Sequence, residues 1–357
     1  MEFKRLGDYI REVNVRNRDL TVTKLVGLTI DKAFIPSVAN VIGTDLSNYK
    51  VIQKEQFACS LMQVSRDEKM PVAMFEEDEA IMSPAYPMFE VIDKSVLLPK
   101  YLMMWFTRSE FDREASYYAV GGVRGSLTWE DFCNMRLPIP TIDRQREIVA
   151  EYETLANRIR INGQMIAKLE ETAQALYRKM FVDGIDKENL PEGWRMGKIG
   201  DIADVNSGKT CVDKSDIKDE LHQYPVAGAS GIIGYSSSYN YDEKMMTTGR
   251  VGTLGVVNRY NQQMYMADNV LVARSIYYEF CYQILKSLDY SEITKGGVQS
   301  LITQTDLKES IIVIPPKELL MSFEQQEASI YSLVDTKKHE NEKLIELQSL
   351  LLARMGQ

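Results

Sequence analysis

The sequence predicts an α+β fold with an internal repeat, in which two mixed α/β domains alternate with two long helices. Three observations predict this class. A twenty-residue stretch occurs twice, two long segments lack proline and carry apolar residues at heptad spacing, and short apolar runs are separated by turns rich in glycine and serine. The chain has 357 residues, which is room for two domains of ordinary size.

The repeat is clearest in "GGVRGSLTWEDFCNMRLPIP", Gly121 to Pro140, and "GGVQSLITQTDLKESIIVIP", Gly296 to Pro315. The two stretches align without a gap, and seven positions are identical. Upstream, "FKRLGDYI" near residue 3 matches "MGKIGDIA" near residue 196. We therefore expect a first domain at 1–142, a long helix at 143–182, a linker at 183–194, a second domain at 195–317 and a second long helix at 318–357.

The first long helix carries an unbroken apolar seam. Its positions alternate in steps of four and three residues, and they are Ile148, Tyr152, Leu155, Ile159, Asn162, Ile166, Leu169, Ala173, Leu176 and Met180. This spacing is typical of a coiled coil, and a single buried Asn in such a seam commonly fixes the register. The helix is too long for one small domain to cover, so we expect the helix of the second repeat to pack against it, antiparallel and with pseudo-two-fold symmetry. The alternative is two packing helices of one globular core.

The second long helix is less regular. One set of positions keeps the seam spacing: Val334, Lys337, Asn341, Leu344, Gln348, Leu351 and Met355. A leucine-rich face competes with it, formed by Leu344, Leu347, Leu350 and Leu351. The pattern therefore predicts the pairing of the helices and leaves the register of the second helix open.

The two domains are predicted to be mixed. The runs "KLVGLTI", "NVLVAR" and "SIIVIP" favour strands, and "YLMMWFTRSEFDREA" favours helix. Segments such as "GASGIIGYSSSYN" and "TTGRVGTLG" are typical of turns.

Composition limits the chemistry. The four cysteines, Cys59, Cys133, Cys211 and Cys281, form no C-x-x-C pair and are expected to be buried free thiols. With only two histidines, His222 and His339, a metal site or histidine-based catalysis is not expected. No run of about 18 apolar residues predicts a membrane span, and the start has no signal peptide, so a cytoplasmic location is expected.

The net charge of -9 argues against nucleic acid unless basic residues are gathered locally. Two near-miss motifs are also present. "VNSGKT", ending at Thr210, has Ala203 where a phosphate-binding loop needs glycine, so a strand end with a Ser-Gly turn is favoured. "SPAY", Ser83 to Tyr86, has Ala85 where amino-methylating enzymes carry a second proline, so a rigid loop is favoured.

The order of parts resembles the specificity (S) subunit of type I restriction–modification systems over nearly the whole chain. The stretches that carry the resemblance are "LPEGWRMGKIGDIADVNSGKT", "GASGIIGYSSSYN" and the "GGV…LPIP…QREIV" element before the first long helix. The second copy of this element departs from the first, because "IVIPPKELLMSFEQQE" has a longer gap between proline and glutamine.

The resemblance implies a non-catalytic subunit in which each target-recognition domain reads one half of a split double-stranded DNA target. The helices would set the unread spacer. Two modification subunits, which carry the methyl donor, would dock on this frame, and restriction (motor–nuclease) subunits would join for cleavage. No cofactor is expected in this chain, and no membrane partner.

Candidate DNA contacts are polar and basic residues on turns, because arginine pairs with guanine and asparagine with adenine through two hydrogen bonds. The candidates are Asn14, Arg16, Asn17, Arg18, Arg124, Ser126, Lys209, Thr210, Ser230, Tyr235, Arg250, Lys295, Gln299 and Ser300. Each is equally a solvated surface residue on sequence grounds alone.

Two other functions remain open at this stage. The chain could be a coiled-coil protein scaffold that does not read DNA, and a gel shift with and without a methylating partner separates that from a reader. It could also be a fragment of a DNA methyltransferase, but the sequence lacks the glycine-rich signature of a methyl-donor site.

Overall fold

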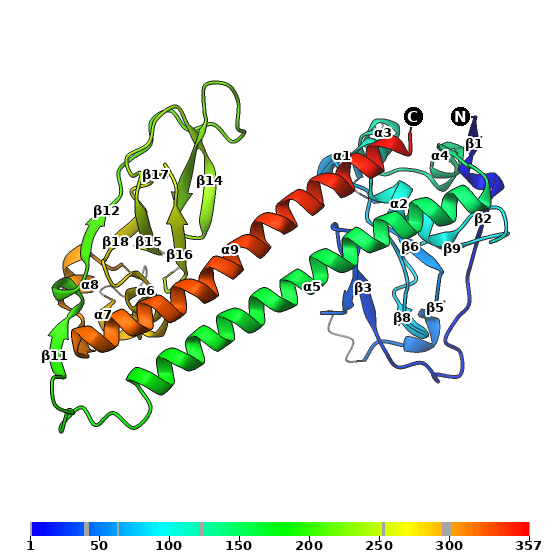
Figure 1. Ribbon diagram of the computed structural model, residues 1–357. Coiled ribbons are helices and arrows are strands. Elements are labelled where there is room, and N and C mark those ends of the chain that lie inside the picture. The colour runs from blue at the N-terminus through cyan, green and yellow to red at the C-terminus, as the bar shows by residue number, and fades with distance from the viewer. Residues whose placement is uncertain are drawn as a thin grey trace. The chain divides into compact units, whose positions relative to one another are not determined.

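The computed structural model describes residues 2–38, 43–62, 64–120, 125–251, 254–294 and 301–356 (Figure 1). The chain forms two compact units, one made of Met1–Asn162 with His339–Gln357 and the other of Gly163–Lys338. Each unit contains both helices and strands, so the mixed α/β class predicted from the sequence is confirmed.

The first unit is built on short antiparallel sheets. A four-stranded sheet has the order β2-β9-β6-β7, and the other strands form three separate pairs, β1–β10, β3–β4 and β5–β8. The strands are β1 (Phe3–Arg5), β2 (Ile10–Glu12), β3 (Val26–Leu28), β4 (Phe34–Pro36), β5 (Lys50–Gln53), β6 (Phe57–Cys59), β7 (Val72–Met74), β8 (Glu79–Met82), β9 (Met88–Val91) and β10 (Arg136–Pro138). The short helices are η1 (Leu6–Asp8), η2 (Leu46–Asn48), α1 (Val64–Asp67), α2 (Pro99–Thr107), α3 (Ser109–Ala119) and α4 (Trp129–Asn134).

The second unit has a four-stranded sheet of order β12-β18-β15-β16, a three-stranded sheet of order β14-β13-β17 and the pair β11–β19. Its strands are β11 (Arg195–Lys198), β12 (Asp204–Ser207), β13 (Tyr224–Gly228), β14 (Gly231–Ser236), β15 (Lys244–Gly249), β16 (Val257–Asn261), β17 (Tyr265–Met266), β18 (Val270–Arg274) and β19 (Ile311–Ile314). Its short helices are η4 (Ile199–Asp201), α6 (Tyr278–Ser287), α7 (Tyr290–Ile293) and α8 (Gln304–Glu309).

The repeated sequence closes each domain in the same way. In the first unit β1 pairs antiparallel with β10, and in the second β11 pairs antiparallel with β19. Each opening strand runs directly into a 3₁₀ turn, whose first residue donates a backbone hydrogen bond back across the closure, from Leu6 to Met135 (2.8 Å) and from Ile199 to Ser310 (3.0 Å). The two ends of each domain are therefore joined beside the start of a long helix.

Two of the seven identities in the repeat are helix caps. Thr128 precedes α4, and its hydroxyl accepts from the backbone N–H of Asp131 at 3.0 Å. Thr303 precedes α8 and accepts from the backbone N–H of Asp306 at 3.1 Å, while the Asp306 carboxylate accepts from the Thr303 backbone N–H. Threonine at the N-cap satisfies amide donors that the first turn leaves unpaired, so this position has the same role in both copies.

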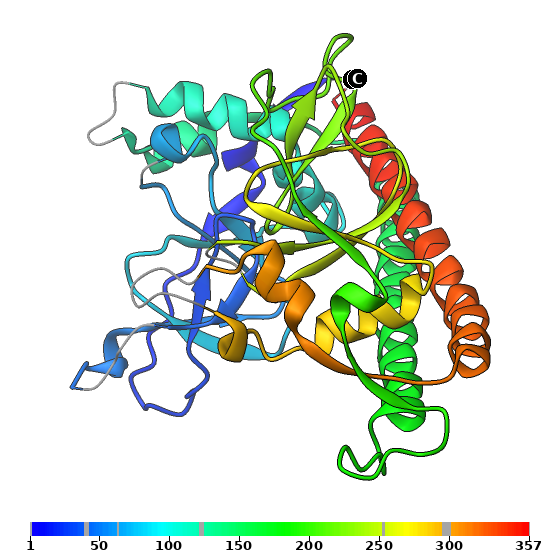
Figure 2. The same ribbon diagram turned by 90° about the vertical axis from the view of Figure 1, so that its left-hand side faces the viewer.

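The two long helices are α5 (Ile142–Phe181) and α9 (Lys317–Arg354). Within each unit they lie against each other and run in opposite directions (Figures 1 and 2). In the first unit the Asn162 amide donates to the Asn341 carbonyl oxygen at 2.9 Å, and Tyr152 shares a core with Met355. In the second unit the Phe181 ring meets the Phe323 ring edge-on, with 4.9 Å between centroids.

The seam predicted on α5 faces inward. All ten of its positions are buried or half-buried, and Asn162 is fully buried. On α9 the positions with seam spacing, Val334 to Met355, are likewise buried or half-buried, whereas Leu347 and Leu350 are 50% and 56% exposed. The register that the sequence left open is therefore the seam register, and of the leucine-rich face only Leu347 and Leu350 point to solvent.

Each domain core continues onto both long helices. In the first unit Ile148 and Val149 of α5, and Met355 directly after α9, join the cluster around Phe89 and Phe106. In the second unit the cluster around Phe280 takes in Ala173, Tyr177 and Phe181 of α5 and Leu320, Phe323, Tyr331 and Val334 of α9. The helices are thus parts of the domain cores and not appendages to them.

Two of the four cysteines match the expected buried free thiols. Cys59 and Cys281 are buried, and burial raises the pKa of both, in Cys281 to about 12. Cys133 and Cys211 are only half-buried. Within the described ranges, none of the helices combines the length and the apolar character that crossing a membrane requires.

The seam makes a prediction that separates two leucines three residues apart on α9. Leu344→Asp places a charge in the half-buried seam and is expected to lower the free energy of unfolding by about 2–4 kcal/mol. Leu347→Asp, on the exposed face, is the matched control and is expected to change it by less than about 0.5 kcal/mol. Chemical denaturation of the intact chain measures both, and equal losses would contradict the seam register.

Candidate nucleic-acid interface

Two of the predicted arginines meet at one residue of the first unit. The chain leaves β2 and passes beside β5, where Arg16 forms an isolated bridge with Lys50. The Arg16 Nη1 donates to the Asn48 backbone carbonyl at 2.6 Å, and the Arg18 Nη1 donates to the Asn48 side-chain oxygen at 3.1 Å. Each of these bonds uses one of the five donors that a guanidinium carries. The fold therefore holds two arginine side chains against the turn η2.

The asparagines of this segment differ from each other. Asn14 is exposed, as a DNA contact requires. Asn17 is only 1% exposed, and its side-chain amide bonds the Val22 backbone on both sides, accepting from the N–H at 3.2 Å and donating to the carbonyl at 2.9 Å. The geometry gives Asn17 the role of closing the loop 17–22, and it lends no support to a DNA contact there.

A cation that the sequence did not single out lies beside Arg16. Lys50 begins β5, is 7% exposed and donates to the Tyr86 carbonyl at 2.8 Å. Burial and the positive charge of Arg16 lower the pKa of its ammonium group. Arg16, Arg18 and Lys50, here termed the basic corner, thus concentrate positive charge in a chain of net charge -9. The run "KVIQ", Lys50–Gln53, predicts only a strand. The position of Lys50 beside Arg16 follows from the bridge between these two residues, which the sequence does not reveal.

Both near-miss motifs adopt the ordinary local structures that were expected. In the "SPAY" stretch the Tyr86 N–H donates to the Ser83 carbonyl at 3.2 Å, which makes a turn. In "VNSGKT", β12 ends at Ser207, and the Gly208 N–H donates to the Val270 carbonyl at 3.1 Å. A Cβ at Gly208 would lie 1.9 Å from the Ala267 carbonyl oxygen, so the glycine is required by a close approach of two backbones.

Lys209 and Thr210 follow on the exposed surface of the second unit. The Thr210 hydroxyl donates to Asp268 at 2.7 Å, and the Tyr265 hydroxyl donates to the Thr210 carbonyl at 3.0 Å. The Lys209 N–H donates to the Met266 carbonyl at 2.9 Å, and the Lys209 side chain is exposed.

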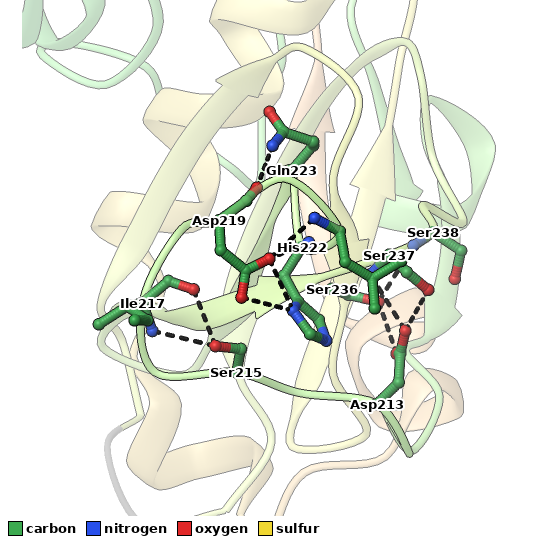
Figure 3. Close-up of polar contacts among 10 residues, drawn as sticks. Asp213, Ser215, Ile217, Asp219, His222, Gln223, Ser236, Ser237 and Ser238 are labelled. Carbon is green, nitrogen blue, oxygen red and sulfur yellow. Dashed lines mark hydrogen bonds and ion pairs between the residues drawn. The ribbon is translucent and has the colours of Figure 1, made fainter.

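The loop 211–223 is fastened to β14 by Asp213, as Figure 3 shows. Its carboxylate accepts from the Ser236 hydroxyl at 2.7 Å, from the Ser237 N–H at 3.0 Å and from the Ser237 hydroxyl. The hydroxyls of Ser237 and Ser236 and the Ser237 amide hold the pKa of this carboxyl far below its usual range. Two further bonds join Ser215 and Tyr235 through their backbones, each 2.8 Å.

The same loop is also held from within. The Asp219 carboxylate accepts from the backbone N–H of His222 at 2.7 Å and of Leu221 at 2.9 Å, and it lies 3.0 Å from the His222 ring nitrogen (Figure 3). The His222 amide and ring lower the pKa of Asp219. These bonds give a polar loop with exposed lysines a fixed course over the hairpin β13–β14.

The remaining candidates of the second unit lie on two sheets. Ser230 is exposed in the turn between β13 and β14, and Tyr235 is half-buried on β14. Arg250 follows β15 on the other sheet, where its backbone bonds Asn269 and Ile302. The structure therefore brings Tyr235 to the fastened loop, and Arg250 belongs to a different edge of the domain.

The last candidates belong to the two Gly-Gly turns. Ser126 is half-buried next to Gly125, which has a positive φ of 68°. Arg124, Lys295, Gln299 and Ser300 lie outside the described residues. In the part of the chain that the structure covers, no group of three or more His, Cys, Asp or Glu side chains is arranged to hold a metal ion.

Comparison with known proteins identifies what this arrangement is similar to. Residues 191–349 match the family model of the type I restriction modification DNA specificity domain. The chain is 20% identical over 374 residues to the type I restriction enzyme HindI specificity subunit of Haemophilus influenzae, covering 78% of this chain and 81% of the relative. It is also 20% identical over 312 residues to the MjaIX specificity subunit of Methanocaldococcus jannaschii, covering 74% and 70%.

The fold is shared with a solved structure as well. The crystal structure of a type I restriction–modification system S subunit from M. genitalium matches with a TM-score of 0.62 at 12% identity, over 100% of this chain and 96% of that chain. The resemblance to type I specificity subunits that the sequence motifs indicated is thereby confirmed.

The Asp213 contacts predict how the loop 211–223 responds to mutation and to acid. Asp213→Ala removes the acceptor for three donors, so trypsin is expected to cleave after Lys214 and Lys218 severalfold faster than in the wild type. Asp216→Ala is the matched control. The Asp216 side chain is 91% exposed, and its ion pair with the Lys214 ammonium, at 3.5 Å, lies within the loop itself. Because the pKa of Asp213 is lowered in the folded protein, its hydrogen bonds to Ser236 and Ser237 contribute fully above about pH 4, the pKa in the unfolded chain. This contribution weakens as the pH falls below that value. Equal cleavage rates in the two variants would show that Asp213 does not hold the loop.

Proposed function

We propose that this chain, on the premise of its confirmed likeness to type I restriction–modification specificity subunits, reads a bipartite double-stranded DNA target with its two domains. The observation that carries the proposal is the repeated closure of the two domains. β1–β10 and β11–β19 end each domain at the same structural point, and the polar loops between these strands are unlike. A duplicated frame with diverged loops suits a protein that holds two different DNA half-sites.

The two long helices are proposed to act as an antiparallel coiled coil that relates the two repeats by pseudo-two-fold symmetry. The inward seam of α5 and α9 and the Asn162–Asn341 bond support this. The seam of α5 is apolar apart from Asn162, and an asparagine pair in such a seam fixes the register of two helices, because any slip leaves an amide unpaired. In this scheme the helices set the unread spacer between the half-sites.

Two modification subunits, which bring the methyl donor, and the restriction subunits are the proposed partners, and the chain itself is proposed to be non-catalytic. If the modification subunits supply many of the contacts to DNA phosphates, this chain can bind DNA despite its net charge of -9. The basic corner in the first unit and Lys209, Thr210 and the loop 211–223 in the second are the proposed DNA-facing elements. Arg124, Ser126, Ser230, Tyr235, Arg250, Lys295, Gln299 and Ser300 remain predicted contacts.

A gel shift separates this function from that of a protein scaffold. The purified chain is expected to bind a random duplex weakly at physiological salt and to gain affinity and sequence preference when the modification subunits are added. The physical reason is that clustered cations, and not net charge, supply the salt-dependent attraction to phosphate. Tight binding by the chain alone would overturn the shared-contact account, and no binding with partners present would favour the scaffold.

Domain exchange tests the division of labour. Replacing residues 1–120 with the matching domain of a relative is expected to change one half of the methylated target and to leave the other half and the spacer intact. Within the first domain, Arg16→Ala is expected to relax one base position by about 1–3 kcal/mol, because arginine reads guanine through two hydrogen bonds.

Sequencing of methylated sites in cells carrying the system measures both effects, with Arg11→Ala as the control, since Arg11 is paired with Glu90 at 2.5 Å. A change in both half-sites after the exchange would contradict the modular account. A uniform loss over all sequences would make Arg16 a phosphate contact.

A further inference from the structure

The joint between α6 and α9 in the second unit contains polar side chains where a core is expected. Gln283 and Glu279 of α6 are 1% and 2% exposed, and Glu327 of α9 is 0% exposed. Two of these three residues carry carboxyl groups, and an ionised carboxylate is costly to bury without a partner. The surroundings of each carboxyl group therefore have to stabilise it, by an ion pair or by a bound proton.

Glu279 is accounted for by an ion pair. The Arg259 guanidinium on β16 donates to Glu279 Oε1 at 2.8 Å, and it lies 3.5 Å from the centre of the Tyr331 ring and 4.9 Å from that of Tyr282. Arginine is weakly hydrated and stacks on aromatic faces, so it tolerates such a place. The Arg259 guanidinium therefore balances the charge of Glu279.

Glu327 has a different environment. Gln283 Nε2 donates to Glu327 Oε2 at 3.0 Å and to the Tyr331 hydroxyl at 3.1 Å. Among the described residues, neither Glu327 Oε1 nor Gln283 Oε1 has a hydrogen-bond partner. Both orphans are acceptors, on two groups that one hydrogen bond already joins, and a hydrogen-bond donor is what both lack.

A proton on Glu327 supplies that donor. A neutral carboxylic acid has one O–H donor and keeps its acceptor capacity, so it can receive from the Gln283 amide and donate to its oxygen at the same time. Burial raises the pKa of Glu327 to about 7, against the opposing effect of the Gln283 hydrogen bond. The two acceptors without partners and the raised pKa of Glu327 therefore point to the same protonation state.

The first repeat shows what the pair replaces. α6 begins at Tyr278, 179 residues after α2 begins at Pro99. The two seam asparagines that bond each other, Asn162 and Asn341, are also 179 residues apart. At the same spacing Gln283 matches Met104, and Glu327 matches Ile148. Met104 and Ile148 are both buried in the core of the first unit. One repeat thus has two apolar side chains where the other has an amide and an acid.

We propose that Glu327 is held as a neutral carboxylic acid paired with Gln283, and that this acid–amide pair fixes α6, and with it the second domain, on α9 only while the proton is bound. The charged and titratable groups that surround the pair are Glu279, Tyr278 and Tyr282 on α6, Arg259 on β16, Lys244 on β15, Glu324, Tyr331 and Asp335 on α9 and Glu170 on α5. Most are acids or phenols, so loss of the proton adds a negative charge to an acidic joint.

The sign of the pH dependence follows. The folded protein binds the Glu327 proton more tightly than the unfolded chain does, so the folded state carries more protons between about pH 4.5 and pH 7. Stability from this pair is complete below that window, and it declines as the pH rises through it.

The experiment compares the intact wild-type chain with Glu327→Gln. Glutamine keeps a donor and an acceptor at the same place without a titratable proton. The thermal midpoint of the wild type is expected to fall by several degrees relative to Glu327→Gln between pH 5.5 and pH 8.5. An infrared band of a protonated carboxylic acid, present in the wild type at pH 6 and absent from Glu327→Gln, reports the proton directly.

A second set of variants tests the pairing without reference to pH. Gln283→Met and Glu327→Ile each leave one polar partner buried alone, whereas the double variant recreates the apolar pair of the first repeat. The double variant is expected to be more stable than either single one, because coupled partners are non-additive. Parallel pH profiles for the wild type and Glu327→Gln, or no such infrared band, would overturn the proposal, and so would additive losses in the double variant.

Discussion

A helix of 40 residues with an apolar seam along its whole length is the constraint on which the structure depends. Such a helix extends for about 60 Å, and a small domain covers only part of it. The rest of the seam has to be buried by another helix, and the chain supplies that helix from its second repeat. Because α5 and α9 run in opposite directions within each unit, each domain core receives the start of one helix and the end of the other. The sequence-distant segment 339–357 therefore belongs to the first unit and not to the second.

Domain and helix are also tightly connected along the chain. β10 ends at Pro138 and α5 begins at Ile142, and β19 ends at Ile314 and α9 begins at Lys317. Proline at these short connections restricts the backbone and stops the strand. The strand before each helix is paired with the first strand of its own domain, so the start of the helix is held by both ends of that domain. The sequence of a surface loop can change without disturbing this closure. The closing strands of the two repeats are therefore alike, whereas the loops differ.

The sequence was informative where short-range rules dominate. The heptad spacing predicted both long helices and the inward face of α5, and the threonine–aspartate pairs of the repeat are local caps. It was uninformative where a residue's role depends on a distant partner. The bond of Arg16 to Asn48 and the burial of Lys50 depend on strand register. Asn17 resembled a surface contact, but its amide closes a loop on Val22, a use that composition does not reveal. The competing leucine face of α9 lost because the Asn341 amide bonds Asn162 and the Ile159 carbonyl, which fixes the rotation of the helix.

A duplicated chain faces a problem that a chain without repeats does not have, since each domain meets two similar helices. The seam alone offers both domains much the same apolar surface. Polar substitutions inside the joints remove this ambiguity, because a buried amide or acid placed against an apolar partner loses its hydrogen bonds and costs more than the matched pair gains. Gln283 opposite a residue such as Ile148 would be left unpaired, and so would Glu327 opposite Met104. Divergence at one matched pair of positions thus raises the energy of the exchanged arrangement, while the correct one keeps the Gln283–Glu327 hydrogen bond. In coiled coils, unpaired polar groups destabilise the wrong partner and so determine which helices pair. Here the same effect applies where a helix packs against a domain.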